Sequence, residues 1–355
     1  MTTPNAKDQT ALSDLLTSTI ALLAQFSPTP TLTTQPPPQI PNAPNPLHVL
    51  RDAGTLLKAH TTKLSLLAIT KPFTPSAIIT VLKDLSGTCI PALKSAEQIC
   101  SHQARETWGA IMSAEVQKRV ARTFRELEAL LSEIKSLNNG TAIKGRGEGL
   151  GSTGVVWEAC DALIALDGLG IAGLAVEKAE MYRDTIKDAI TELQEWRDGE
   201  DVDHEGHEDD LVDEFDEDVH GDDDSFDDLF NAANSMPKDN PELKALVDEA
   251  DGKLKKIVLL YNALIKRRVK TFKSGDIPEK NVAALDDLIE KLKNVPNLVD
   301  ELVGSFYDLD EDNAKETLKS CVDEAKTAAG KVDQNWEAKE DEFTNWHKKW
   351  EEAIA

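Results

Sequence analysis

The chain is poor in cysteine and in aromatic residues. It has 4 cysteines in 355 residues, no C-x-x-C pair, and an aromatic content of 5%. Cys89 and Cys100, if they share a helix, lie about 16 Å apart along its axis at 1.5 Å per residue, which is too far for a disulfide. Unpaired cysteines at this low density are typical of a reducing intracellular compartment.

No grouping of serine, cysteine or histidine with a general base is visible, so the sequence predicts no catalytic residues, no metal site and no cofactor. Two glycine motifs resemble phosphate-binding loops, one from Gly149 to Gly154 and one from Gly168 to Gly173. A kinase would also need its strand lysine and its catalytic loop, and a dinucleotide fold would need a βαβ unit. We interpret the two motifs as a flexible loop and a helix-helix turn.

Two further patterns resemble metal sites only in part. Asp308 to Asn313 begins like a calcium-binding EF-hand loop, but Lys319 stands where the bidentate glutamate would be. This stretch is better interpreted as the start of a helix. His204 and His207 lie among carboxylates without the spacing of a designed zinc site.

The sequence also lacks stretches in which apolar and polar residues alternate as they do in a strand. Apolar residues instead recur every three or four positions, as in the stripe from Trp108 to Ile134. The most apolar window, Val155 to Val176, contains three acidic residues, which argues against a membrane span. We predict an all-α protein of two packed helical bundles, each of four or five helices, separated by a disordered acidic segment.

Basic residues are missing entirely from residues 198–228, where 18 of 31 residues are Asp or Glu. The formal net charge of the chain is −25, so the remainder carries only −7. Repulsion and scarce apolar surface prevent such a segment from folding alone. A concentrated negative field argues against direct binding of nucleic acid and favours a basic protein partner.

These features divide the chain into four parts. Residues 1–46 are an N-terminal helix and a linker rich in proline, with eight prolines between residues 28 and 46. Residues 47–197 form an N-terminal bundle, residues 198–238 the acidic segment, and residues 239–355 a C-terminal bundle.

Apolar residues set among the acidic ones suggest partner contact, because charge steers a basic protein while apolar anchors prolong its residence. The candidate contact residues in the acidic segment are Asp209, Asp210, Phe215, Asp216, Asp218, Asp222, Asp223, Asp224 and Phe226. The alternative is that the segment only solubilises the protein or tethers the bundles.

A basic cluster from Ile265 to Lys273 is the second candidate site. Its charged members are Lys266, Arg267, Arg268, Lys270 and Lys273. They suggest a nuclear localisation signal or an anion-binding patch. They equally suit the end of a helix, whose dipole favours cations there, and the acidic segment could fold back onto them.

Several dispersed stretches resemble the cyclin-D-binding protein family, also called GCIP. They are Thr62 to Leu67 with Pro72 to Ser76, Val155 to Cys160, Leu254 to Ile257, and Ala284 to Asp287. The order of parts is also similar, with an acidic segment between two helical halves. The chain is therefore identified as a divergent, fungal-like member.

The resemblance implies an all-α, non-enzymatic protein of the cytoplasm and nucleus that binds a cyclin-like partner and acts as an adaptor or cell-cycle regulator. The charge distribution supports an alternative, an acidic escort chaperone that shields a basic client such as a ribosomal protein or a histone. Neither function involves direct nucleic-acid or membrane binding.

Overall fold

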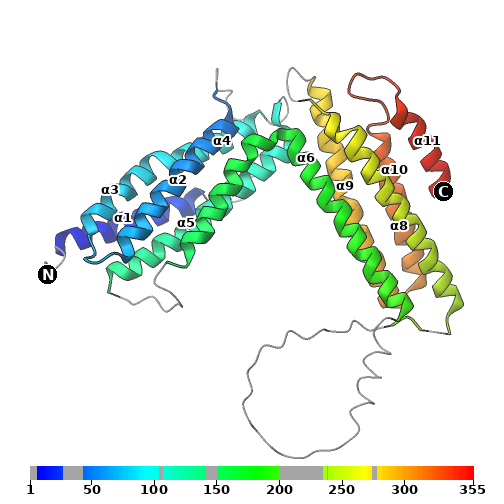
Figure 1. Cartoon of the computed structure of the whole chain (residues 1–355), viewed down its shortest axis with the longest axis horizontal. Helices are drawn as coiled ribbons and strands as arrows, with labels where there is room; N and C mark the ends of the chain where they lie inside the picture. The colour runs from blue at the N-terminus through cyan, green and yellow to red at the C-terminus, as the bar shows by residue number, and fades with distance from the viewer. Residues whose placement is uncertain are drawn as a thin grey trace, which may run out of the picture. The chain divides into compact units, whose positions relative to one another are not determined.

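The computed structural model describes residues 6–26, 43–103, 107–140, 150–199, 235–237, 239–273 and 278–355. The prediction of an all-α fold is confirmed, since these residues form helices and no strand (Figure 1). The α-helices are α1 (Ala6–Phe26), α2 (Pro46–Ile69), α3 (Pro75–Asp84), α4 (Ile90–His102), α5 (Gly109–Asn138), α6 (Ser152–Asp198), α8 (Pro241–Arg267), α9 (Glu279–Tyr307), α10 (Glu311–Gly330) and α11 (Glu342–Ile354).

The chain divides into two compact units. The N-terminal unit contains residues 1–175 and 273–286, and the C-terminal unit contains residues 176–272 and 287–355. These limits differ from those expected from the sequence, because the second half of α6 packs in the C-terminal unit. The acidic segment therefore joins α6 to α8 within one unit.

The division of α6 has a local cause at Gly170. Its φ of 58° and ψ of −173° interrupt the helix, and only glycine adopts such a conformation without strain. The predicted helix-helix turn in the second glycine motif is confirmed here. Gly149 of the first glycine motif lies outside the described residues, and α6 begins inside the motif, at Ser152, so its last three residues are helical and not the predicted loop.

The N-terminal unit packs α1 to α5 and the first half of α6 around one apolar core. Fully buried side chains come from each helix, among them Leu16, Leu57, Phe124 and Leu163. Burying such a side chain contributes about 1.5–3 kcal/mol. Helix α1 is part of this bundle, which corrects its expected separation with the proline-rich linker. Residues 27–42 of that linker lie outside the described residues.

Pro91 should kink or divide a helix, and it follows a π-helical turn. Residues Leu85–Cys89 form this turn between α3 and α4, and the Ile90 N–H bonds to the Leu85 carbonyl. Proline has no N–H and its ring crowds the carbonyl four residues earlier, so the wider turn accommodates it without ending the helix. Helix α9 likewise continues through Pro296.

The C-terminal unit packs the second half of α6 with α8, α9, α10 and α11. Helix α10 begins as predicted, with Asp310 Oδ1 accepting a hydrogen bond from the Asn313 N–H at 3.1 Å. Tyr261 is fully buried, and its hydroxyl donates to the Leu292 carbonyl at 2.6 Å. Apolar stripes on α8 and α9 therefore face inward, as their spacing predicts.

Two helical stretches, Pro75–His102 and Ser152–Asp198, are long and apolar enough to cross a membrane by length and composition alone. Core helices of soluble proteins meet the same criteria. Both stretches supply side chains to the apolar core, including Leu82 and Leu163.

Candidate partner-binding groove

Helix α8 ends in the basic cluster, and its most central member is not on the surface. The Arg268 side chain is 0% exposed. Its Nη1 and Nη2 atoms lie 2.7 and 2.9 Å from the two carboxylate oxygens of Asp341. Arg268 is therefore removed from the predicted anion-binding patch.

Arg268 also binds the segment that leads into α11. Its Nε donates to the Val332 carbonyl at 2.6 Å and its Nη2 to the Asp333 carbonyl at 2.8 Å. The guanidinium carbon lies 4.4 Å from the centre of the Phe343 ring. A planar group with five donors satisfies this arrangement, whereas lysine would not.

The Asp341 carboxylate also caps the N-terminus of α11. Asp341 caps the helix by accepting hydrogen bonds from the Phe343 and Thr344 N–H groups. Hydrogen bonding to Arg268 holds the pKa of Asp341 down at about 2, against an opposing effect of burial. One ion pair thus fixes both the end of α8 and the beginning of α11.

The spacing of Phe343, Trp346, Trp350 and Ile354 favours packing on the C-terminal bundle over a partner-binding face, and the apolar face of α11 does pack on the unit. Phe343, Trp350 and Ile354 are buried, and the Trp350 indole N–H donates to the Lys256 carbonyl at 2.8 Å. Trp336 precedes the helix and packs edge-on against Phe272. Trp346 is only half-buried.

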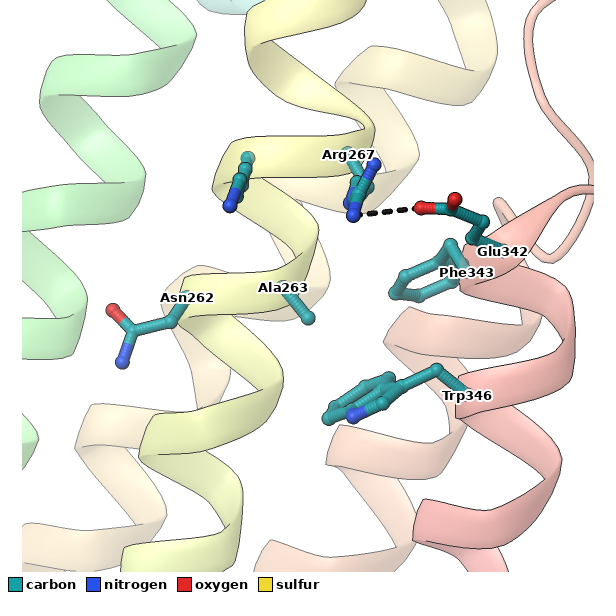
Figure 2. A pocket seen from close by; sticks show the side chains of 7 residues that line it. Asn262, Ala263, Arg267, Glu342, Phe343 and Trp346 are labelled. Carbon is teal, nitrogen blue, oxygen red and sulfur yellow. Dashed lines mark ion pairs between the residues drawn. The ribbon is translucent and has the colours of Figure 1, made fainter.

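Trp346 lines a groove between α8 and α11, with a volume of about 430 Å³. Figure 2 shows Ala263 and Trp346 facing each other across this groove, with Phe343 beside them. We call it the α8–α11 groove, and its lining residues are Asn262, Ala263, Lys266, Arg267, Glu342, Phe343 and Trp346. A small residue on one wall and aromatic rings on the other leave room for an apolar side chain.

The α8 side of the groove is positively charged. Lys266 is exposed and forms no ion pair with the residues that the structure describes, while Arg267 pairs with Glu342 at 2.7 Å. Lys270 pairs with Glu180 at 3.0 Å, and Lys273 is exposed. The structure therefore brings only Lys266 and Arg267 of the predicted cluster into the groove.

The predicted contact residues in the acidic segment, Asp209 to Phe226, lie outside the described residues, as do His204 and His207. The flanks of the segment are described and lie together. The Met236 N–H donates to the Trp196 carbonyl at 3.0 Å, and a Cβ atom on Gly199 would lie 3.7 Å from the Ser235 Cβ. The segment thus leaves and re-enters the C-terminal unit at one point.

The cysteines and the clusters of metal-ligating side chains can be assessed within the described ranges. Among the residues in the described ranges, no group of three or more histidine, cysteine or acidic side chains is arranged to hold a metal. All four cysteines are buried and free. Burial raises the pKa of Cys89 to about 11 and the pKa values of Cys100, Cys160 and Cys321 to about 12, so these thiols stay protonated at neutral pH.

Comparison with known proteins gives the family of this chain. Models described as the N-terminal and C-terminal domains of "Grap2 and cyclin-D-interacting" proteins match residues 49–199 and 213–329. The chain belongs to this family. The two matches are separated by residues 200–212, so the C-terminal match begins within the acidic segment.

Two known proteins are similar to this chain over most of its length. The chain is 25% identical over 319 residues to an uncharacterised protein of Schizosaccharomyces pombe, covering 86% of this chain and 83% of that protein. It is 29% identical over 272 residues to the cyclin-D1-binding protein 1 homolog of Xenopus laevis, covering 74% and 72%. Helix α11 lies beyond the end of the family's C-terminal domain match.

The stretches that carry the family resemblance have structural roles in this fold. Ser65 bonds to Thr153 at 2.7 Å between α2 and α6. Asp286 accepts hydrogen bonds from the Ala110 and Ile111 N–H groups at the start of α5. These residues therefore stabilise the fold, and they do not line the α8–α11 groove.

The sequence suggests a partner-binding face at Trp336, Phe343, Trp346 and Trp350 only as the less favoured alternative to core packing, and it does not indicate the α8 wall, which lies far away in the chain. The stripe that ends in Trp346 and Trp350 is typical of a buried helix face. The available signal was that α11 carries more aromatic residues than one buried stripe needs, which leaves Trp346 half-exposed beside Ala263.

Proposed function

We propose that this family member is a non-enzymatic interaction protein of the cyclin-D-binding type, and that its partner docks in the α8–α11 groove. The observation that carries the proposal is the open apolar space between Ala263 and Trp346, with cationic side chains at its edge. The family description and the name of the Xenopus relative support a cyclin-type partner.

The groove suits a helix of the partner better than an extended strand. Its walls are two helices, whose backbone N–H and C=O groups are used internally, so no sheet edge is available for strand addition. Large apolar side chains spaced at i and i+4 on a partner helix would enter beside Trp346. Tryptophan is enriched among residues that dominate binding energy when a partner covers it.

The decisive experiment is to measure the affinity of the full chain for a D-type cyclin with and without the Trp346 ring. We expect Trp346→Ala to weaken binding by about 30-fold, corresponding to a hot-spot contribution of about 2 kcal/mol. Trp157→Ala is the matched control, because Trp157 is 36% exposed but belongs to the N-terminal unit. Equal effects of the two variants would refute the assignment of the groove.

A second candidate function is favoured by the 18 acidic residues between positions 198 and 228. Acting as an acidic escort, the segment would bind a basic client such as a ribosomal protein or a histone. The fixed flanks at Trp196 and Met236 would present it from a single point on the C-terminal unit.

The two proposed functions can be distinguished by the salt dependence of binding and by which substitutions weaken it. Escort binding to a Lys/Arg-rich protein should weaken strongly as salt rises, because screening shortens the reach of exposed charges to about 8 Å at 0.15 M. Changing Asp209, Asp210, Asp222, Asp223 and Asp224 to Asn should weaken it, because five of the 18 carboxylates are lost, while Trp346→Ala should not. An unchanged affinity after this neutralisation would exclude the escort function.

We also propose that the protein occupies both cytoplasm and nucleus. Lys266, Arg267, Lys270 and Lys273 are the exposed residues of the basic cluster that could act in nuclear import, whereas Arg268 is buried. A variant with Lys266, Arg267, Lys270 and Lys273 all changed to Ala should shift a fluorescently tagged chain toward the cytoplasm. An unchanged distribution would remove the cluster from consideration as an import signal.

A further inference from the structure

The α8–α11 groove favours an occupant that is both apolar and acidic. Ala263, Phe343 and Trp346 supply apolar surface, and Lys266 stands beside it together with Arg267, which pairs with Glu342 at 2.7 Å. Leu259, which is 57% exposed, lies on the same face of α8 as Ala263, one turn earlier. The apolar surface therefore continues beyond the groove along α8.

The acidic segment of the chain itself contains a stretch that combines apolar and acidic side chains. Leu211, Phe215 and Val219 recur every four residues between positions 200 and 234, surrounded by carboxylates. A helix formed on docking would put these three side chains on one face. Glu214 and Asp218 would then stand along one edge of that face, next to the apolar side chains.

The attachment of the segment brings this stretch within reach of the groove. Arg197, near the point where the segment leaves the unit, pairs with Asp248 on α8. From Asp248 to Lys266 the helix rises about 27 Å at 1.5 Å per residue. The 16 residues from Gly199 to Phe215 span up to about 53 Å when extended, and the return to Ser235 is longer.

Tethering makes docking favourable even when the contact is weak. A segment held by both ends is present at the groove at an effective concentration on the order of millimolar. Opposite charges add to this, because the acidic segment supplies carboxylates and Lys266 forms no ion pair among the described residues.

We propose that residues 211–219 dock in the α8–α11 groove when no partner is bound, with Phe215 beside Trp346 and with Glu214 and Asp218 facing Lys266 and Arg267. The partner then competes with the chain's own segment for one site. This competition rests on the proposed function, whereas occupancy of the groove can be measured without any partner.

Photo-crosslinking in the full chain tests occupancy directly. A benzophenone amino acid at position 215 should crosslink to peptides containing residues 259–267 or 342–349, identified by mass spectrometry. Lys266→Glu with Arg267→Glu should reduce this crosslink at least fivefold, because both changes place carboxylates against carboxylates. Lys315→Glu with Lys319→Glu is the matched control, since these residues are exposed on α10 and do not line the groove.

Mixing isotopically light and heavy chains shows whether the crosslink forms within one molecule. Crosslinks within one chain at the groove support the proposal. Crosslinks scattered over the surface, crosslinks only between chains, or equal loss in both charge variants would overturn it.

Affinity measurements separate this inference from the proposed function. Phe215→Ser should raise the affinity for a D-type cyclin about tenfold if the segment occupies the groove in nine molecules of ten. If the cyclin does not bind but the crosslink forms, the proposed function fails and the docking stands. If the cyclin binds and Phe215→Ser changes neither affinity nor groove protection in hydrogen exchange, the docking fails and the proposed function stands.

Discussion

Exposed ion pairs occur in both units, but among the described residues only the C-terminal unit holds a fully buried cation. In the N-terminal unit, ion pairs such as Lys58 with Asp161 and Arg122 with Glu158 join helices at the exposed surface. In the C-terminal unit, Arg268 is completely buried and holds Asp341 together with two backbone carbonyls. Exposed pairs contribute little to stability, whereas a buried cation is costly unless every donor is satisfied.

The two units also differ in how they expose apolar side chains next to a groove. The N-terminal unit buries its leucine-rich stripes in one core. The C-terminal unit fixes α11 partly through the polar contacts of Arg268, and Trp346 is left half-exposed at an open groove. We infer that the N-terminal unit is the scaffold and the C-terminal unit carries the binding surface.

The largest expected effect comes from Arg268→Met. Removing the guanidinium leaves Asp341 and two carbonyls without their partner, which should lower the free energy of unfolding of the C-terminal unit by about 3–5 kcal/mol. Arg122→Met in the N-terminal unit should cost at most about 1 kcal/mol, because its pair with Glu158 is exposed. Denaturant titration of each variant measures both values, and similar costs would remove the contrast between the units.

A smaller loss is expected from Gly109→Ala in the N-terminal unit. Gly109 has a φ of +72°, and an added Cβ would lie 2.7 Å from Asp286 Oδ1 and 2.8 Å from Ile171 Cδ1. The left-handed conformation alone costs about 1–2 kcal/mol for alanine, and the contact would disturb the cap that Asp286 provides. Labelling of Cys89, Cys100 and Cys160 should then accelerate more than labelling of Cys321, whose unit is unchanged; uniform acceleration would mean that the units unfold together.

Acid should release α11 through Asp341. Its pKa is about 2 in the folded chain and about 3.9 when unfolded, so its contribution to stability is present above pH 4 and is lost as pH falls toward 2. The loss is on the order of 1 kcal/mol, because the carboxylate is partly exposed and water screens it.

Asp184 in the same unit also has a pKa of about 2, held down by Arg183. Hydrogen exchange of α11 between pH 4 and pH 2 should therefore be compared in Asp341→Asn and Asp184→Asn variants. The pH dependence should disappear only in the first. A dependence that persists in Asp341→Asn would assign it to another group.

The smallest expected effect is an increase in stability, whereas the preceding substitutions lower it. Gly252 lies inside α8 with nothing within 4 Å of an added Cβ. Gly252→Ala should stabilise the C-terminal unit by up to about 1 kcal/mol, since alanine has the higher helix propensity. A rise in the unfolding midpoint would check this, and a fall would show that the site is more crowded than the structure indicates.

The helices could be predicted because their apolar periodicity is a local property. The start of α10 at Asp310 and the turn at Gly170 also follow from short-range chemistry. The burial of Arg268 could not be predicted, because the acceptors of four of its five side-chain hydrogen bonds lie 64 to 73 residues later in the chain. A cation beside other cations is usually exposed, and only tertiary contacts with Asp341 reverse this.

The limits of the two units could not be predicted for a related reason. Composition marks residues 198–228 as the obvious boundary, yet the contacts of Met236 with Trp196 return the chain to the same unit. The actual change of unit follows Gly170 inside one apolar stretch, where the sequence shows no change in composition.

Hydrogen-deuterium exchange of the full chain with and without a D-type cyclin tests the central claim most directly. We predict that binding protects residues 259–267 of α8 and 342–349 of α11, and leaves residues 155–161 around Trp157 unchanged. Protection confined to the N-terminal unit, with none at Ala263 and Trp346, would contradict the assignment of the binding surface to the C-terminal unit.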